Sequence, residues 1–256
     1  MAVMGWQLFR ERFSGYEDCY TVIGGFACEV LLRNAELDFR ATKDIDMIVL
    51  LEDRFSEFGH IFWEFIREGG YKCGWRQDPD LHFYRFTDPK PGYPAQIELF
   101  SRMPDYHFHA EGEIIPIYID AEVSSLSAIV MNEDFYNLLN EGKTVVDGIS
   151  TIEAVFLIPF KMYAWVNLVE KKEKGEHVNE RDLKKHKLDV FRLLQIVPDN
   201  ATVQLSGLCK EAALTYIDRV QKETIHLGQI GLDFSQAEAL ARLREIYFAG
   251  ENGVNT

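Results

Sequence analysis

The chain has 256 residues, of which 47% are hydrophobic and 27% are charged, so it is long enough for a large core and is neither disordered nor fibrous in composition. Its net charge of -14 opposes non-specific attraction to nucleic acid. The charged N-terminus lacks the apolar core of a signal peptide, and no apolar run is long enough to span a bilayer. The sequence therefore predicts a soluble, cytoplasmic protein with no membrane partner.

Two local features add to this picture. The four cysteines lie far apart without a C-x-x-C pair, so neither a zinc site nor a disulfide framework is indicated. Between Lys161 and Arg192, nine Lys or Arg stand against six Asp or Glu, which makes a basic segment inside an acidic protein. A solvated helix face explains such a segment as well as a binding surface does.

The first half of the chain has the pattern of a mixed α/β domain. Apolar residues at helical spacing predict helices over 6–13, 26–34 and 54–68. Runs rich in β-branched and aromatic residues predict strands over 20–23, 44–51, 71–76, 82–86, 95–100 and 114–119. The strand over 44–51 becomes continuously apolar after its start, which is typical of a central strand.

The second half has the pattern of a helical domain. Long helices are predicted over 152–174, 179–197, 206–221 and 235–248, and a short helix and turn over 132–147 joins the halves. The expected fold class is α/β (α+β). A mixed-sheet domain over 1–124 is expected to be followed by an all-helical domain over 125–256 that completes its cleft.

A pair of aspartates opens the predicted central strand. Side chains at i and i+2 of a strand share a face and lie about 6.6 Å apart along the chain, so Asp44 and Asp46 converge on one site. Two-metal phosphoryl transfer uses ions roughly 4 Å apart, bridged by carboxylates, to clamp the attacking and leaving oxygens. Mg²⁺ prefers such hard oxygen ligands. We expect Mg²⁺ or Mn²⁺ at this pair.

Two further features fit the same chemistry. Gly24 and Gly25 lie between a predicted strand and a predicted helix, where backbone N–H groups can meet a triphosphate without a side chain in the way. Glu98 is a lone acid in the strand A-Q-I-E-L-F, where a third carboxylate is expected. Each feature alone is more often a turn or an exposed acid, but their order along the chain favours a nucleoside triphosphate (NTP) site.

The stretch from Ile23 to Val49 resembles the nucleotidyltransferase superfamily related to DNA polymerase β, with its strand, Gly-Gly and Asp-x-Asp. More narrowly, R-A-T-K-D-I-D from Arg40 to Asp46 is similar to the AbiEii-type toxin nucleotidyltransferases. The resemblance implies metal binding and catalysis by Asp44, Asp46 and Glu98. It also implies nucleotide contacts at Gly24, Gly25, Arg40 and Thr42.

The same resemblance extends into the helical half. It implies nucleotide-binding roles for Lys161, in L-I-P-F-K, and for Lys185 and Asp189, in K-H-K-L-D, although His186 stands where the family usually has Asp. A Lys on a helix facing the sheet would neutralise triphosphate charge, with Asp189 orienting it. A Lys that snorkels from an amphipathic helix is the alternative.

The expected reaction moves a nucleoside monophosphate from an NTP to a hydroxyl of RNA, particularly a tRNA end, or of protein. The resemblance implies a toxin or phage-defence role, with a cognate antitoxin as partner. A non-catalytic nucleotide-binding or antitoxin-binding module, a small-molecule nucleotidyltransferase and a glycosyltransferase remain alternatives. His107 and His109 would share a strand face, but no third metal ligand accompanies them.

Overall fold

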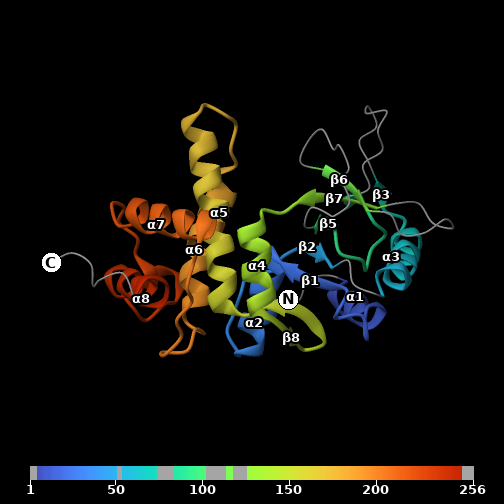
Figure 1. Ribbon diagram of the computed structural model, residues 1–256, viewed down its shortest axis with the longest axis horizontal. Coiled ribbons are helices and arrows are strands. Elements are labelled where there is room, and N and C mark those ends of the chain that lie inside the picture. Colours follow the sequence, from blue (N-terminus) through green and yellow to red (C-terminus); the bar gives the residue numbers. More distant parts are fainter. Residues whose placement is uncertain (1–4, 51–53, 74–83, 102–113, 118–125, 250–256) are drawn as a thin grey trace. The chain divides into compact units, whose positions relative to one another are not determined.

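The computed structural model describes residues 5–50, 54–73, 84–101, 114–117 and 126–249 (Figure 1). The chain forms two compact units, of which the first comprises 1–136 and 143–152, and the second 137–142 and 153–256. None of the helices in the described ranges has the length and apolarity that a bilayer crossing demands.

A mixed seven-stranded sheet forms the centre of the first unit (Figure 1). Its strands are β1 (Tyr20–Ile23), β2 (Asp44–Val49), β3 (Lys72–Cys73), β4 (Arg85–Thr87), β5 (Gln96–Ser101), β6 (Ile114–Ile117) and β7 (Leu126–Val130). Five of them follow the order β1-β2-β5-β4-β3, while β7 pairs with β5 and β6 with β7. The pairs β2–β5 and β5–β7 are parallel and the others antiparallel. The predicted α/β class is confirmed, although β7 was not anticipated.

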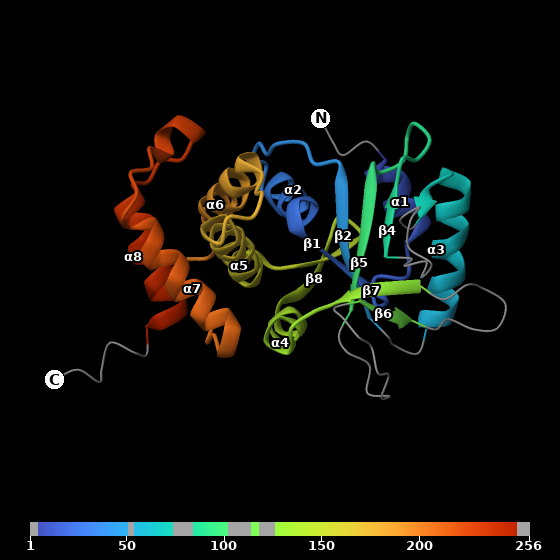
Figure 2. The same ribbon diagram turned by 90° about the horizontal axis from the view of Figure 1, so that it is seen from above.

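One face of this sheet is apolar and is covered by helices. The helices of this part of the chain are α1 (Trp6–Arg12), α2 (Gly24–Asn34) and α3 (Phe55–Gly69). The α1 and α3 helices lie on the same side of the sheet, and α2 lies on the other (Figure 2). Ile45 of β2 and Ile97 of β5 are fully buried on the α1–α3 side, where Phe62 of α3 packs on Phe86 of β4 with ring centroids 5.3 Å apart. Burial of these side chains supplies most of the driving force for this layer.

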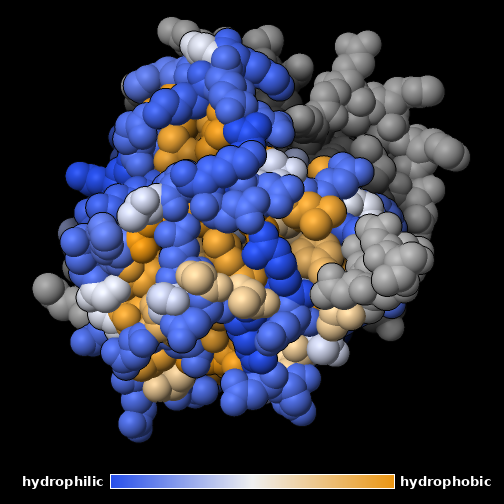
Figure 3. All heavy atoms as spheres, turned by 90° about the vertical axis from the view of Figure 1, so that its left-hand side faces the viewer, coloured by the Kyte–Doolittle hydropathy of each residue, from blue (hydrophilic) through white to orange (hydrophobic). Residues whose placement is uncertain are grey.

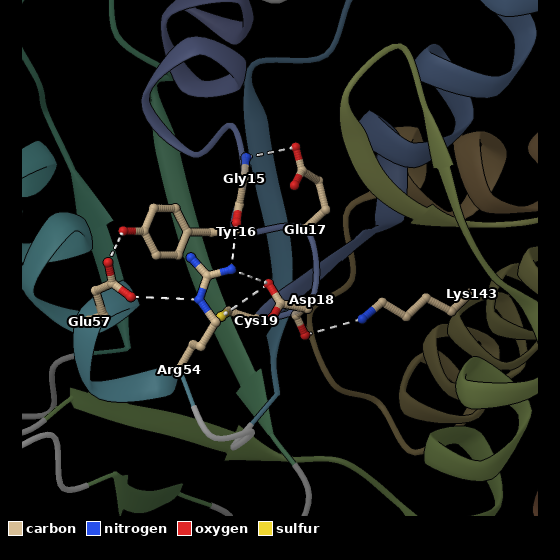
Figure 4. A network of polar contacts seen from close by, with 8 residues as sticks. All are labelled: Gly15, Tyr16, Glu17, Asp18, Cys19, Arg54, Glu57 and Lys143. Carbon is tan, nitrogen blue, oxygen red and sulfur yellow. Dashed lines mark hydrogen bonds and ion pairs between the residues drawn. The ribbon is translucent and has the colours of Figure 1, made fainter.

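The loop that leads into β1 is held by Arg54, the residue before α3 (Figure 4). Its Nη1 donates to the carbonyl of Gly15 at 2.8 Å and lies 3.5 Å from a carboxylate oxygen of Asp18. Its Nε lies 3.6 Å from Glu57, and the guanidinium sits 4.6 Å from the ring centroid of Tyr16. These contacts fix the start of β1, which ends directly at the glycine turn.

A β-hairpin that the sequence interpretation missed also belongs to the first unit. Strands β8 (Lys143–Val146) and β9 (Ile149–Ile152) replace the end of the predicted helix and turn over 132–147. Asp147 (φ 49°) and Gly148 (φ 72°) form their turn, and Asp-Gly between β-branched runs is a strong hairpin signal. The hydroxyl of Thr151 donates to the carbonyl of Val22 at 3.3 Å, so the hairpin supports β1.

The second half of the chain is helical, as predicted. Its helices are α4 (Glu133–Gly142), α5 (Ala154–Glu173), α6 (Glu180–Leu194), α7 (Gly207–Val220), the short 3₁₀ helix η1 (Leu227–Ile230) and α8 (Gln236–Phe248). Pro159 lies inside α5 and has no N–H for the carbonyl of Val155. The buried hydroxyl of Tyr247 in α8 donates to that carbonyl at 2.5 Å, which explains how α5 continues through a proline.

Candidate active site

The acids of the sequence motif lie on the polar face of the sheet. In the parallel pair β2–β5, Asp44 is opposite Gln96 and Asp46 is opposite Glu98. Opposite residues of neighbouring strands point to the same side, so all four share one face. The alternate residues, such as Ile45, are buried on the other face. The register therefore places the three predicted acids on one side of two adjacent strands.

The glycine turn lies directly against this acidic face. In the β1–β2 pair, Ile23 is opposite Asp46, and α2 begins at the next residue, Gly24. Gly24 has φ +69°, and a Cβ at this position would overlap the Oδ2 atom of Asp46. Only glycine fits there, because a side chain would occupy the space of the carboxylate. The helix begins two residues before the predicted start, so both glycines form its first turn.

Gly25 lies against the residues at the start of the R-A-T-K-D-I-D motif. A Cβ on Gly25 would lie 2.9 Å from Cγ2 of Thr42 and 3.7 Å from Nη1 of Arg40. The structure thus brings together Gly24, Gly25, Arg40, Thr42 and Asp46, all of which the sequence assigned to nucleotide or metal binding. Arg40 also stacks over the ring of its neighbour, with its guanidinium carbon 4.8 Å from the centroid of Phe39.

Glu29 of α2 is a positioning residue that the sequence interpretation missed. One of its carboxylate oxygens accepts hydrogen bonds from the backbone N–H of Thr42 at 3.1 Å and from its hydroxyl at 3.0 Å. The residue is only 3% exposed, and Arg33 lies 3.5 Å from its other oxygen. An acid within the apolar run A-C-E-V-L-L was the available signal, because a buried carboxylate needs partners.

Glu98 has a cationic partner that the sequence did not reveal. Arg85 of β4 is directly opposite Glu98, and its Nε lies 2.6 Å from Oε1. The amide of Gln96 donates to the same oxygen at 2.8 Å. Within the described ranges, no three His, Cys, Asp or Glu side chains are grouped so that they could hold a metal ion. Glu98 contacts Arg85 and does not complete a group of three acids with Asp44 and Asp46.

Two of the helical residues form a buried ion pair in the second unit. Nζ of Lys161 in α5 lies 3.5 Å from Oδ2 of Asp189 in α6, with the side chains 2% and 0% exposed. Arg192 lies 3.4 Å from the other carboxylate oxygen. Lys161 therefore does not snorkel to water. Lys185 instead pairs with Asp182 at 2.9 Å, so the structure does not bring it to this ion pair.

His186 stands beside the ion pair and carries a strongly shifted pKa. Its pKa is lowered from 6.5 to about 4, chiefly by burial and also by the charge of Lys161, while Asp189 acts in the opposite direction. Lys185 also lowers the pKa of His186, and Asp182 raises it. Its buried Nδ1 has no hydrogen-bond partner among the described residues. The imidazole is therefore neutral at pH 7 in the folded protein.

The shifted pKa of His186 predicts a pH-dependent stability. Its folded-state pKa is depressed, so its contribution is complete above pH 6.5 and is lost as the pH falls toward about 4, because the unfolded chain binds the proton first. We expect His186→Gln to reduce the loss of unfolding free energy between pH 6.5 and 4 by about 3 kcal/mol. Denaturant unfolding at several pH values measures this. His177→Gln, which changes an exposed histidine, is the control and should leave the parent's curve unchanged.

A cavity of about 880 Å³ lies among the helices of the second unit, with Trp165, Val169, Lys172, Leu188 and Ile230 among its lining. None of the predicted site residues lines it. The face of the helical unit drawn in Figure 3 shows apolar side chains in orange between polar ones in blue. His107 and His109 lie outside the described residues.

Comparison with known proteins yields no assignment. No protein-family model matches the chain, and a search of curated proteins finds no match.

Proposed function

We propose that the chain is a metal-dependent nucleotidyltransferase of the AbiEii-type branch of the polymerase β-related superfamily. The observation that carries this proposal is the register of β1, β2 and β5. It places Asp46 beside Glu98 on the polar face, directly against the Gly24-Gly25 start of α2. Acids at the end of a strand beside a glycine-led helix are the arrangement that a metal-bound triphosphate needs.

Each group at the site has a chemical task in this reaction. Asp44, Asp46 and Glu98 would hold Mg²⁺ or Mn²⁺, which supplies charge neutralisation at the transferring phosphate. The N–H groups of the first turn of α2 carry the positive end of the helix dipole, so they would stabilise the negative charge of phosphate oxygens. Thr42 is held by Glu29 beside that turn. Catalysis then rests on positioning and on electrostatics.

The acceptor that we propose is a hydroxyl of RNA, such as a tRNA end, or of protein, in a toxin or phage-defence role with an antitoxin as partner. The sequence motif supports this branch. A non-catalytic nucleotide-binding or antitoxin-binding module would keep the glycine turn but would not need three acids on one face. A small-molecule nucleotidyltransferase and a glycosyltransferase differ in the substrate that accepts or donates the group.

One labelling experiment tests the reaction class and the acceptor together. The protein is incubated with each α-labelled NTP, Mg²⁺ and a whole-cell extract, and the label is traced in RNA, protein and small molecules. Metal-dependent incorporation into RNA or protein is expected. Label that stays entirely in free nucleotide with every NTP would favour the non-catalytic module. Transfer from a nucleotide-sugar in place of an NTP would favour the glycosyltransferase.

The close approach of Gly25 to Thr42 predicts that a side chain at position 25 lowers the affinity for the nucleotide. Gly25→Ala places a Cβ 2.9 Å from Cγ2 of Thr42, so Thr42 must move. We expect NTP affinity to fall about tenfold, which corresponds to about 1.4 kcal/mol. The double variant Gly25→Ala, Thr42→Ser lacks Cγ2 but keeps the hydroxyl bonded to Glu29, so it should recover most of the affinity. Calorimetry measures both, and unchanged affinity in folded Gly25→Ala protein would refute the assignment.

A further inference from the structure

Two walls of the cavity in the second unit are formed by neighbouring helices. The α5 and α6 helices lie side by side (Figure 1). Trp165 and Val169 of α5 line the cavity, as do Lys184 and Leu188 of α6. Residues three or four positions apart share one face of a helix, so each helix turns one face toward the cavity. The segment 223–230, between α7 and α8, forms a third wall.

The third wall is held in place by the side chain of Gln236, the first residue of α8. Its Nε2 donates to the carbonyls of Val220 at 2.8 Å and Glu223 at 3.0 Å. Its Oε1 accepts a hydrogen bond from the backbone N–H of Ile225 at 2.9 Å. A wall that is already fixed need not be ordered when a ligand enters, which lowers the free-energy cost of binding.

The lining of the cavity offers apolar surface to a ligand. Val169, Ile225 and Ile230 line it and are half-buried. Trp165 is almost fully buried and packs edge-on against Tyr216, with ring centroids 5.2 Å apart. The volume of about 880 Å³ lies in the range of about 300 to 1,000 Å³ that is usual for small-molecule sites. The cavity can therefore take the apolar part of a small molecule.

The charges of the lining leave one cation without a partner. The lining contains three acids, and each forms an ion pair with a Lys or Arg: Glu173 with Arg219, Glu180 with Lys172, and Glu223 with Lys187. Lys184 also lines the cavity, is exposed, and forms no ion pair with any described residue. A ligand of complementary charge therefore carries one negative charge, placed near Lys184.

We propose that this cavity binds a small amphipathic anion, whose apolar body lies between α5, α6 and the third wall and whose single carboxylate lies near Lys184. Thr224 and Gln229 of the third wall also line the cavity and can donate hydrogen bonds to a carboxylate. The site is independent of the proposed nucleotidyltransferase, because no residue assigned to nucleotide or metal binding lines the cavity.

Calorimetric titration of the whole protein with decanoate and with decyltrimethylammonium tests the charge of the ligand, since the two carry alkyl chains of similar length and opposite charge. We expect saturable binding of decanoate and about tenfold weaker binding of the cation, because Lys184 attracts only the carboxylate. The net charge of -14 alone would favour the cation. Equal affinity for both probes, or tighter binding of the cation, would overturn the proposal.

Substitution of the apolar wall tests whether decanoate occupies this cavity. Val169→Trp fills part of the cavity from α5 and should abolish decanoate binding. Ile230→Trp narrows it from η1 and keeps the test available if Val169→Trp does not fold. Val145→Trp makes the same change at an exposed valine of β8 and should bind decanoate like the parent. Full affinity in folded Val169→Trp or Ile230→Trp protein would place the ligand elsewhere and contradict the proposal.

A matched pair of lysine variants tests the contact with the carboxylate. Lys184→Gln should weaken decanoate binding about fivefold, as expected for the loss of one exposed ion pair. Lys222→Gln removes an exposed lysine that does not line the cavity, and should keep the affinity of the parent. Equal weakening in both variants would indicate a general charge effect, and no detectable binding of decanoate to the parent would leave no ligand site. Either result would overturn the proposal.

Discussion

Asp46→Asn should fold like the parent and lose metal-dependent nucleotidyl transfer by about a thousandfold or more, as expected when a charge that stabilises the transition state is removed. The substitution keeps the size of the side chain and removes the charge that would hold the ion. Asp46 is the acid with the most central place, since it is opposite both Ile23 and Glu98 and lies against Gly24. Steady-state transfer from a labelled NTP measures the loss.

Other acids provide the comparison for this variant. Asp44→Asn should have a similar effect, and Glu98→Gln a strong but smaller one, because Glu98 already shares its charge with Arg85. Asp38→Asn is the matched control, since Asp38 is exposed and precedes the motif, and it should retain the parent's rate. Equal loss in Asp38→Asn would mean that acidity in this segment matters for folding and not for chemistry.

Lys161→Met should lower the free energy of unfolding by about 3 kcal/mol, since it leaves a buried carboxylate without one of its two cationic partners. Asp189 is fully buried, and Arg192, at 3.4 Å, compensates only part of the loss. The sequence alone favours a different outcome, in which Lys161 contacts the nucleotide and its removal affects stability little. Denaturant unfolding, monitored by circular dichroism, measures the change.

The double variant Lys161→Met, Asp189→Leu separates burial of charge from loss of contact. Replacing both members of a buried pair by apolar residues of similar volume is often neutral or stabilising, so most of the lost stability should return. Lys185→Met, which removes a more exposed partner of Asp182, is the control and should change stability by less than about 0.5 kcal/mol. A single Lys161→Met variant as stable as the parent would contradict the buried-pair account.

Periodicity predicted most of the fold because most of the elements have a strong local pattern. The α3 helix repeats apolar residues at helical spacing, β5 alternates along its length and β2 alternates at its start, so their buried faces follow from the sequence alone. The β8–β9 hairpin was missed because a preceding helical pattern was extended through it, although Asp147-Gly148 carries a hairpin signal. At such a junction the sequence is compatible with both a helix and a hairpin, and packing of the hairpin on β1 favours the hairpin.

The sequence could not predict those contacts of the candidate site that join residues far apart in the chain. The sequence motif identifies Asp44, Asp46 and the two glycines as site residues. They lie close together in the structure because they are close in the chain and belong to neighbouring strands. Arg85 could not be paired with Glu98, because that contact depends on the order of strands in the sheet. For the same reason the sequence could not assign Glu29 to Thr42.

We propose that the acidic face of β2 and β5 binds a nucleoside triphosphate through a divalent metal. Calorimetric titration with a non-hydrolysable NTP analogue, with and without Mn²⁺, on the parent, Asp46→Asn and Asp38→Asn proteins tests it most directly. We expect strong binding that requires Mn²⁺ in the parent and in Asp38→Asn and is lost in Asp46→Asn. Equal affinity with and without Mn²⁺, or full Mn²⁺-dependent affinity in folded Asp46→Asn protein, would contradict it.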